Sequence, residues 1–149
     1  MSKNHRHSDQ KIPRAFTTPA QSKMPKATAT PREDCIPEFR ADQMDMIGTW
    51  GWQNFDPMHM QALLHKLFDS QKLTWQQLYQ RGSHLIKVRD IISNARKRLI
   101  NLQKDDLDEL YSLRLTGTKR IWGIKENNIL WLLWWDPKHE ICPSILKHT

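Results

Sequence analysis

The segment from Leu110 to Ser144 constrains the fold more than any other, because it contains four strand-like runs separated by turn signals. It reads LYSLRLTGTKRIWGIKENNILWLLWWDPKHEICPS. Three short breaks supply the turn signals: Gly117-Thr118, Glu126-Asn127-Asn128 and Asp136-Pro137-Lys138. Leucine, tryptophan and β-branched residues fill the runs between them. This pattern predicts an antiparallel β-meander over about residues 110–142.

Alternation along the first run assigns its residues to two faces of the predicted sheet. Tyr111 and Leu113 fall on one face, which we expect to be core, whereas Ser112 and Arg114 fall on the other. The run Ile129–Trp135 does not alternate. It therefore predicts a central strand that is covered on at least part of both faces.

A strand and a helix are predicted before the meander. The aromatic segment Met44–Phe55 favours a first strand or an extended hairpin. Asp56 is a good N-cap and Pro57 a good first helical residue, so a helix should begin here. The apolar residues that follow have amphipathic helical spacing: Met60, Leu63, Leu64, Leu67 and Phe68.

Two further helices are predicted between this helix and the meander. Thr74 and Gln77 have the spacing of a capping box, and Gly82 is a suitable terminator, so a short helix should cover Trp75–Arg81. Another helix is expected from about Asp90 to Gln103. Its buried stripe would consist of Ile91, Ile92, Ala95, Leu99 and Leu102.

The order of these elements predicts one α+β domain. Residues 1–41 are polar, contain regularly placed prolines and have few large apolar side chains, so we expect a disordered basic tail. Residues 42–149 should form the domain, with helices at about 57–104 and the meander at about 110–142. We expect the helices to pack on one face of the sheet and to leave the other face for function.

Composition restricts the classes of partner and chemistry. The formal net charge of +7 and the pI of about 9.6 favour acidic partners such as nucleic acid. Without a secretion signal or a long apolar run, we expect a cytoplasmic protein in which Cys35 and Cys142 are reduced thiols. The chain has no glycine-rich phosphate loop, dinucleotide fingerprint or zinc-site spacing. We therefore expect neither a cofactor nor a metal.

Arg114, Arg120 and His139 lie on or at the ends of successive predicted strands, so they form a candidate catalytic site if the strand register places them on one face. Two guanidinium groups would stabilise the pentacoordinate transition state of RNA phosphodiester cleavage, and a histidine would transfer protons. A structural alternative has the arginines solvated or paired with acidic residues at 105–109, and His139 capping the hairpin through Asp136.

Other residues near the hairpins are weaker candidates. Lys119, Lys125 and Lys138 would contact a phosphate backbone, or simply keep the strand ends soluble. The tryptophans at 131, 134 and 135 would stack on bases of single-stranded RNA, although core packing is expected for at least two of them. Cys142 is three residues from His139, so on a common strand the two would point to opposite faces and would not form a nucleophilic pair.

Residues 88–142 resemble the C-terminal half of the RelE-like toxins. The resemblance rests on Tyr111-Ser112-Leu113-Arg114-Leu115 as a first meander strand and on Lys119-Arg120-Ile121-Trp122 as a second. In addition, Asp136-Pro137-Lys138-His139 falls where family members often place a catalytic arginine or histidine. The late tyrosine common in the family has no counterpart, and residues 57–81 add helical sequence.

The resemblance implies a function and partners. A RelE-like toxin is an endoribonuclease that cleaves messenger RNA without a metal, commonly on the ribosome, within a toxin-antitoxin or defence module. Arg114, Arg120 and His139 would then be catalytic, and an antitoxin protein would cover the basic surface. The alternative is a module with the same fold that binds nucleic acid or protein without catalysis, including a gyrase-directed or degenerate toxin.

Overall fold

The computed structural model describes residues 34–143 of the chain. The tail predicted for residues 1–41 falls mainly on residues 1–33, which lie outside the described residues, as do residues 144–149. Residues 38–40, which the sequence analysis assigned to the tail, instead form strand β1 (Glu38–Arg40). The folded part therefore begins earlier than residue 42.

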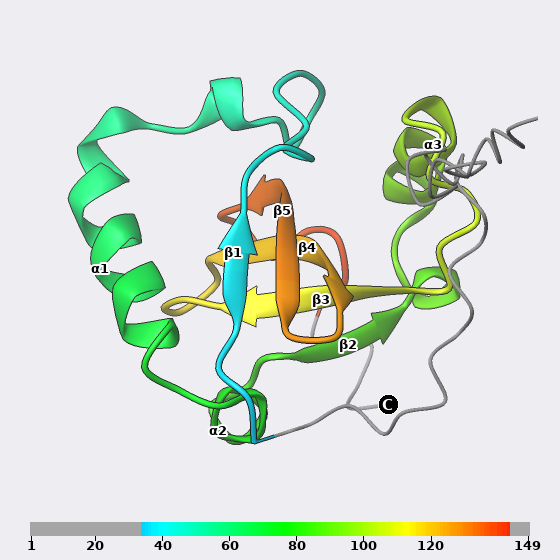
Figure 1. Cartoon of the computed structure of the whole chain (residues 1–149). Helices are drawn as coiled ribbons and strands as arrows, with labels where there is room; N and C mark the ends of the chain where they lie inside the picture. The colour runs from blue at the N-terminus through cyan, green and yellow to red at the C-terminus, as the bar shows by residue number, and fades with distance from the viewer. Residues whose placement is uncertain (1–33, 144–149) are drawn as a thin grey trace, which may run out of the picture. The chain divides into compact units, whose positions relative to one another are not determined.

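The described part has the predicted α+β fold, built on a five-stranded sheet with strand order β1-β5-β4-β3-β2. Strands β2 (His84–Lys87), β3 (Glu109–Arg114), β4 (Arg120–Glu126) and β5 (Ile129–Asp136) pair antiparallel in sequence order. Strand β1 pairs with β5 in parallel. The first and last strands in sequence are therefore neighbours, and Figure 1 shows β1 beside β5.

The predicted meander is confirmed for its first three runs, which form β3, β4 and β5. The predicted fourth run is wrong, because residues 139–143 contain no strand. Ile141 and Cys142 are nevertheless buried, so the apolar character of this run reflects packing against the sheet and not strand pairing. Strand β2 was not predicted, because four residues between two helices give too short a pattern.

The helices follow the predicted starting residues. Asp56 caps the 3-10 helix η3 (Pro57–His59), which leads into α1 (Met60–Ser70), and its carboxylate accepts a hydrogen bond from the N–H of Met58. Thr74 and Gln77 form the predicted capping box of α2 (Trp75–Gln80). The third helix is shorter than the predicted range of about 90–103, because α3 covers Ser93–Asn101, and the 3-10 helix η4 (Val88–Asp90) precedes it.

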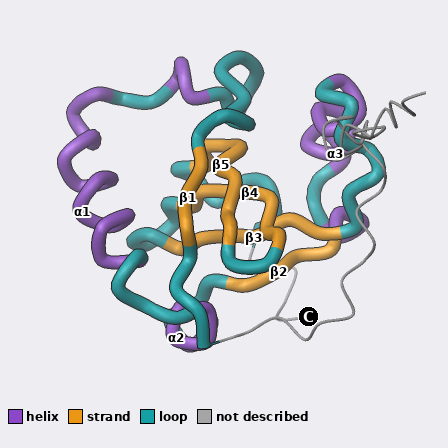
Figure 2. The backbone as a smooth tube through the Cα atoms, in the orientation of Figure 1, coloured by secondary structure: helices purple, strands orange, loops and turns teal. Residues whose placement is uncertain are grey.

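The strand predicted within Met44–Phe55 is wrong. Residues 41–51 form a loop followed by the 3-10 helix η2 (Trp52–Asn54), as Figure 2 shows. Two glycines account for the compact path. Gly48 has a φ of +97°, and a Cβ at Gly51 would lie 2.6 Å from the backbone of Ile47. Aromatic residues are typical of strands, but here Trp50 and Trp52 are buried in the core without an extended backbone.

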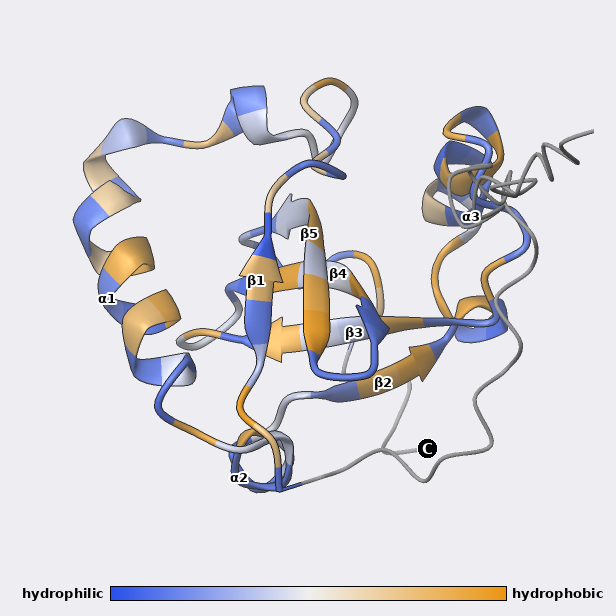
Figure 3. Ribbon diagram, in the orientation of Figure 1, coloured by the Kyte–Doolittle hydropathy of each residue, from blue (hydrophilic) through white to orange (hydrophobic). Residues whose placement is uncertain are grey.

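The sheet has a core on each face, so the prediction that all helices pack on one face is wrong. Helices α1 and α2 contribute Leu63, Trp75 and Leu78 to one core, together with Tyr111 and Leu113 of β3. Helix α3 contributes Ala95 and Leu99 to the opposite core, whose other members include residues of four strands: Ile86, Leu110, Trp122, Leu133 and Trp134. Figure 1 shows α1 and α3 on opposite sides of the sheet, and Figure 3 shows hydrophobic residues concentrated along the strands.

A bulge between β4 and β5 explains why β5 does not alternate. Trp122 pairs with Trp134, but Gly123 pairs with Leu132, which leaves Leu133 as the additional residue. Consecutive residues Leu133 and Trp134 consequently pack into the same core. Gly123 permits the close approach, since a Cβ there would lie 2.5 Å from the carbonyl oxygen of Trp131.

The buried carboxylate of Asp45 attaches the loop after β1 to helix α3 and to the sheet. The Asp45 carboxylate accepts hydrogen bonds of 2.7 and 2.8 Å from Arg98 on α3, and one of 3.0 Å from the indole N–H of Trp134. Burial by itself would raise the pKa of Asp45. The hydrogen bonds from Arg98 and Trp134 outweigh burial, and the pKa of Asp45 lies below its ordinary value of 3.8.

We predict that Asp45→Asn lowers the free energy of unfolding at neutral pH by on the order of 2 kcal/mol, because it removes a charged partner from Arg98 inside the protein. A carboxyl whose pKa is lowered by folding stabilises above its unfolded pKa and loses that contribution as the pH falls below it. The difference between wild type and variant should therefore shrink below about pH 4. Urea denaturation across this range measures it.

The control is Asp42→Asn, which removes an exposed carboxylate from the same loop and should change the free energy of unfolding by less than about 0.5 kcal/mol. Equal stability of Asp45→Asn and the wild type at neutral pH would contradict the anchoring role of the ion pair.

Candidate functional site

The pairing of β3 with β4 resolves the register that the sequence left open. Arg114 and Arg120 are direct partners across this ladder, and Ser112 is the partner of Trp122. Partners across an antiparallel ladder lie on the same face. Both arginines therefore project from the face that also carries His84, since His84 is the partner of Ser112 on the next strand.

A pocket of about 210 Å³ opens on this face. It brings together all three predicted catalytic residues, Arg114, Arg120 and His139. The other lining residues come from β2, the β3–β4 pair and the segment after β5: Gly82, His84, Ile86, Ser112, Trp122 and Cys142. No Asp or Glu is among these residues, and the pocket wall carries the two guanidinium groups of Arg114 and Arg120.

Arg120 is almost buried, with 9% of its surface exposed. Its Nη1 donates hydrogen bonds to the carbonyl oxygens of Gly117 and Lys119, at 2.7 and 3.0 Å, and so closes the β3–β4 hairpin. Burial lowers the pKa of Arg120, the like charge of Arg114 lowers it further, and the Asp136 carboxylate opposes both effects. The guanidinium nevertheless stays charged at neutral pH.

Arg114 is exposed, and its environment differs from that of Arg120. Its backbone N–H donates a 2.8 Å hydrogen bond to the Ser83 hydroxyl, which fixes the end of β3. Its side chain lies over Gly82, where a Cβ would be 3.1 Å from Nη1. Among the described residues this guanidinium makes no hydrogen bond or ion pair, so its donors are available to an anion.

Asp136 holds two walls of the pocket in place. Its Oδ2 accepts 3.1 Å hydrogen bonds from the indole N–H of Trp122 and from the N–H of Ile141, and its Oδ1 accepts one of 2.9 Å from the N–H of Glu140. The side chain is fully buried. The segment after β5 is thus bound to β4 through one carboxylate, and His139 within it has a φ of +55°.

The prediction that His139 and Cys142 point to opposite faces of one strand is wrong. The prediction assumed that both residues lie on a strand, but residues 139–142 form no strand. Both side chains line the same pocket. Cys142 is 6% exposed, and both cysteines remain thiols, as expected.

The three predicted backbone-contacting lysines do not line this pocket. Lys125 lies on the opposite face, where its ammonium group is 4.7 Å from the centroid of the Trp75 ring. Lys119 lies in the β3–β4 hairpin and Lys138 follows β5, next to His139. Trp134 and Trp135 are buried, which confirms the expected core packing, whereas Trp131 is half-buried with Arg40 over its ring.

His84 is the pocket residue that the sequence analysis missed as a candidate. It belongs to the short strand that was not predicted, so no register argument was available for it. The only usable signal was the alternation of His84 and Ile86 in a four-residue run after Gly82. That signal is too short to distinguish a strand from a turn.

No protein-family model, curated protein or solved structure matches this chain, so no family is assigned to it. Within residues 34–143, no three His, Cys, Asp or Glu side chains are grouped so that they would hold a metal ion. None of the helices in that range has the length and apolar character that a membrane span requires.

We predict that Asp136→Asn destabilises the protein by on the order of 2–3 kcal/mol. Both carboxylate oxygens accept hydrogen bonds, so either orientation of the amide directs its NH₂ group against an N–H donor. The segment after β5 should loosen, and Cys142 should react faster with a thiol reagent. The measurements are urea denaturation and the modification rate in a Cys35→Ser background.

Asp106→Asn supplies the control, since Asp106 is exposed in the turn after α3. If a thiol reagent modifies Cys142 at the same rate in Asp136→Asn as in the wild type, then Asp136 does not hold this wall of the pocket.

We predict that inorganic phosphate raises the melting temperature of the wild type but not that of Arg114→Ala, because an anion between Arg114 and Arg120 relieves their repulsion and binds only the folded state. Without phosphate, the variant should be no less stable than the wild type. Lys97→Ala, which removes an exposed charge from α3, should keep the phosphate effect. An equal phosphate shift in Arg114→Ala would show that the anion binds elsewhere.

Proposed function

We propose that this protein is a metal-independent endoribonuclease with the character of a RelE-like toxin. The observation that supports the proposal is the pocket in which Arg114 and Arg120 lie directly opposite each other beside His84 and His139. Two guanidinium groups next to two imidazoles supply both requirements of RNA cleavage, which are stabilisation of phosphate charge and proton transfer.

The arginines have separate tasks in this proposal. Arg114 is exposed and has donors available, so it binds the scissile phosphate as a fork. Arg120 is held by the hairpin carbonyls and contributes a fixed positive charge behind the phosphate. Such a preorganised charge acts on the negative charge that develops in the transition state, and it needs no reorganisation during the reaction.

The histidines divide the proton transfers. One neutral imidazole removes the proton from the ribose 2′-hydroxyl, and the resulting oxygen attacks the adjacent phosphorus. The other, protonated imidazole donates its proton to the 5′-oxygen as the bond between phosphorus and that oxygen breaks. The products are a 2′,3′-cyclic phosphate and a 5′-hydroxyl end, and no redox step or metal is involved. His139 and His84 both line the pocket, and a histidine populates both forms near neutral pH.

The RelE-like character of the proposal is supported by the three meander strands, by Arg114 at the end of β3 and Arg120 at the start of β4, and by His139 in the segment that follows β5. The resemblance further suggests messenger RNA on the ribosome as the substrate and an antitoxin protein as the partner that covers the cationic pocket. The paired histidines would take the place of the tyrosine that the family commonly uses.

The test is inducible expression in bacteria, with growth and transcript 5′ ends read together. We expect the wild type to arrest growth and to create new ends, and Arg114→Ala and His139→Asn to abolish both. Asparagine is chosen at position 139 because it tolerates a positive φ better than alanine does. Arg120→Ala is avoided, because it would also remove the hydrogen bonds that close the hairpin.

Lys97→Ala is the matched control and should arrest growth as the wild type does. Arrest without new transcript ends would redirect the search to gyrase or another protein target. New ends that persist in both pocket variants would refute the assignment of the pocket as the catalytic site.

One observation favours the alternative, a module that binds nucleic acid without cleaving it. Arg120 already has a structural role in the hairpin, so half of the arginine pair is explained without catalysis. Under this alternative, purified protein binds RNA with a strong salt dependence but forms no cyclic phosphate. If the purified protein forms the cyclic phosphate in the presence of ribosomes, this alternative is excluded.

A further inference from the structure

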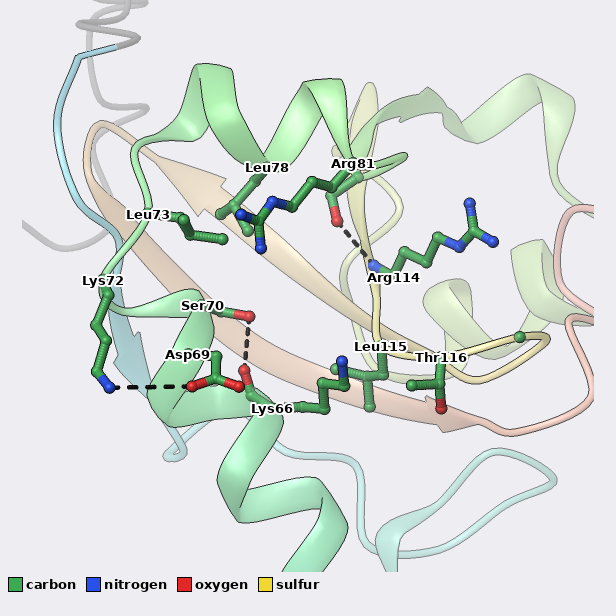
Figure 4. A pocket seen from close by; sticks show the side chains of 12 residues that line it. Lys66, Asp69, Ser70, Lys72, Leu73, Leu78, Arg81, Arg114, Leu115 and Thr116 are labelled. Carbon is green, nitrogen blue, oxygen red and sulfur yellow. Dashed lines mark hydrogen bonds and ion pairs between the residues drawn. The ribbon is translucent and has the colours of Figure 1, made fainter.

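A second, larger pocket of about 520 Å³ lies between α1, α2 and the end of β3. Figure 4 shows its side chains from close by. Leu73, Leu78 and Leu115 supply apolar walls, and these leucines belong to the core formed by α1 and α2 or pack against it. The volume is in the range of pockets that hold small ligands.

The charged residues around this pocket are mainly basic. Lys66, Arg81 and Arg114 line it, as does the ion pair of Lys72 with Asp69, whose atoms are 4.0 Å apart. Among the described residues, the side chains of Lys66 and Arg81 make no ion pair. The pocket therefore carries a net positive charge beside its apolar walls.

Arg114 connects the two pockets, because it lines both of them. In Figure 4 the guanidinium of Arg81 is turned toward Leu73 and Leu78, whereas that of Arg114 is turned the opposite way. The head of Arg114 lies over Gly82, which lines the smaller pocket. A polyanion that contacts Arg114 in the smaller pocket thus has further cations within reach in the larger one.

We propose that the larger pocket binds the nucleotide next to the scissile phosphate of a single-stranded RNA, with Arg81 and Lys66 holding the neighbouring phosphate. This inference rests on the proposed function and adds a substrate-binding subsite to it. The leucines contact the face of the base, and the exposed hydroxyl of Thr116 offers hydrogen bonds to the sugar. The occupied length is therefore at least three nucleotides.

RNA suits this pocket better than an acidic peptide does, because the two pockets share Arg114 as a lining residue and each has cationic side chains. A phosphate backbone carries a charge at each nucleotide, so it matches a series of separated cations. The Thr116 hydroxyl beside the cations suits a ribose, which has both donor and acceptor positions.

The test measures binding of 2′-fluoro RNA, which has no attacking hydroxyl and cannot be cleaved. Fluorescence anisotropy compares a dinucleotide with a pentanucleotide for the wild type, Arg81→Ala, Lys66→Ala and Lys97→Ala. We expect the wild type to bind the pentanucleotide more tightly. Arg81→Ala and Lys66→Ala should each weaken that binding about fivefold and reduce its salt dependence, with little effect on the dinucleotide. Lys97→Ala should behave as the wild type.

Failure of this proposal is distinguishable from failure of the proposed function. If the wild type cleaves RNA but Arg81→Ala and Lys66→Ala bind the pentanucleotide as it does, the subsite is refuted and the ribonuclease stands. If the wild type neither binds nor cleaves RNA, both proposals fail. A glutamate decapeptide that binds only through Arg81, with no RNA binding, would assign the pocket to an acidic protein partner and overturn the nucleotide subsite. Thermal melting confirms that each variant is folded.

Discussion

Two buried aspartates attach the irregular segments of this protein to its sheet, and both do so through tryptophan. Trp122 and Trp134 are partners across the β4–β5 ladder. The indole N–H of Trp122 binds Asp136, and that of Trp134 binds Asp45. A buried carboxylate is tolerated only when donors surround it. Each aspartate therefore draws a segment toward the sheet: the loop after β1 in one case, and the turn that carries His139 in the other.

The pocket depends on the second of these anchors. Asp136 is the register partner of Arg120, which is itself the partner of Arg114, so one row across three strands contains a carboxylate and two guanidiniums. The carboxylate offsets part of the unfavourable proximity of the two arginines. The remaining excess of positive charge is what an anion would neutralise. Under the proposed function, this arrangement lowers the stability of the protein without ligand and raises its affinity for an anionic ligand.

The sequence predicted local features best where a single residue type decides them. The caps at Asp56 and Thr74 and the breaks of the meander depend on side chains acting on their own backbone, so spacing was enough. Strand β1 and strand β2 could not be found this way. Three or four residues form no recognisable period, and both strands exist because a distant partner strand accepts them.

The candidate site was predicted in part. Residue type identified Arg114, Arg120 and His139, but their convergence depended on the β3–β4 register, which alternation alone does not fix. The placement of α3 on the other face was missed for the same reason, because an amphipathic helix indicates that it has a core face but not which core it joins. Lys125 was assigned by charge, whereas its strand position directs it to the face opposite the pocket.

The parallel pairing of β1 with β5 has a consequence for the order of assembly. Glu38–Arg40 find their partners at Ile129–Trp131, about ninety positions later in the chain. Strand β1 therefore emerges from the ribosome long before the strand that pairs with it. The sheet can be completed only after β5 has been synthesised, and the wall that carries His139 follows later still. Contacts of such long sequence separation slow folding. The smaller pocket, which is lined by His139 and Cys142, cannot be complete before translation has passed residue 142.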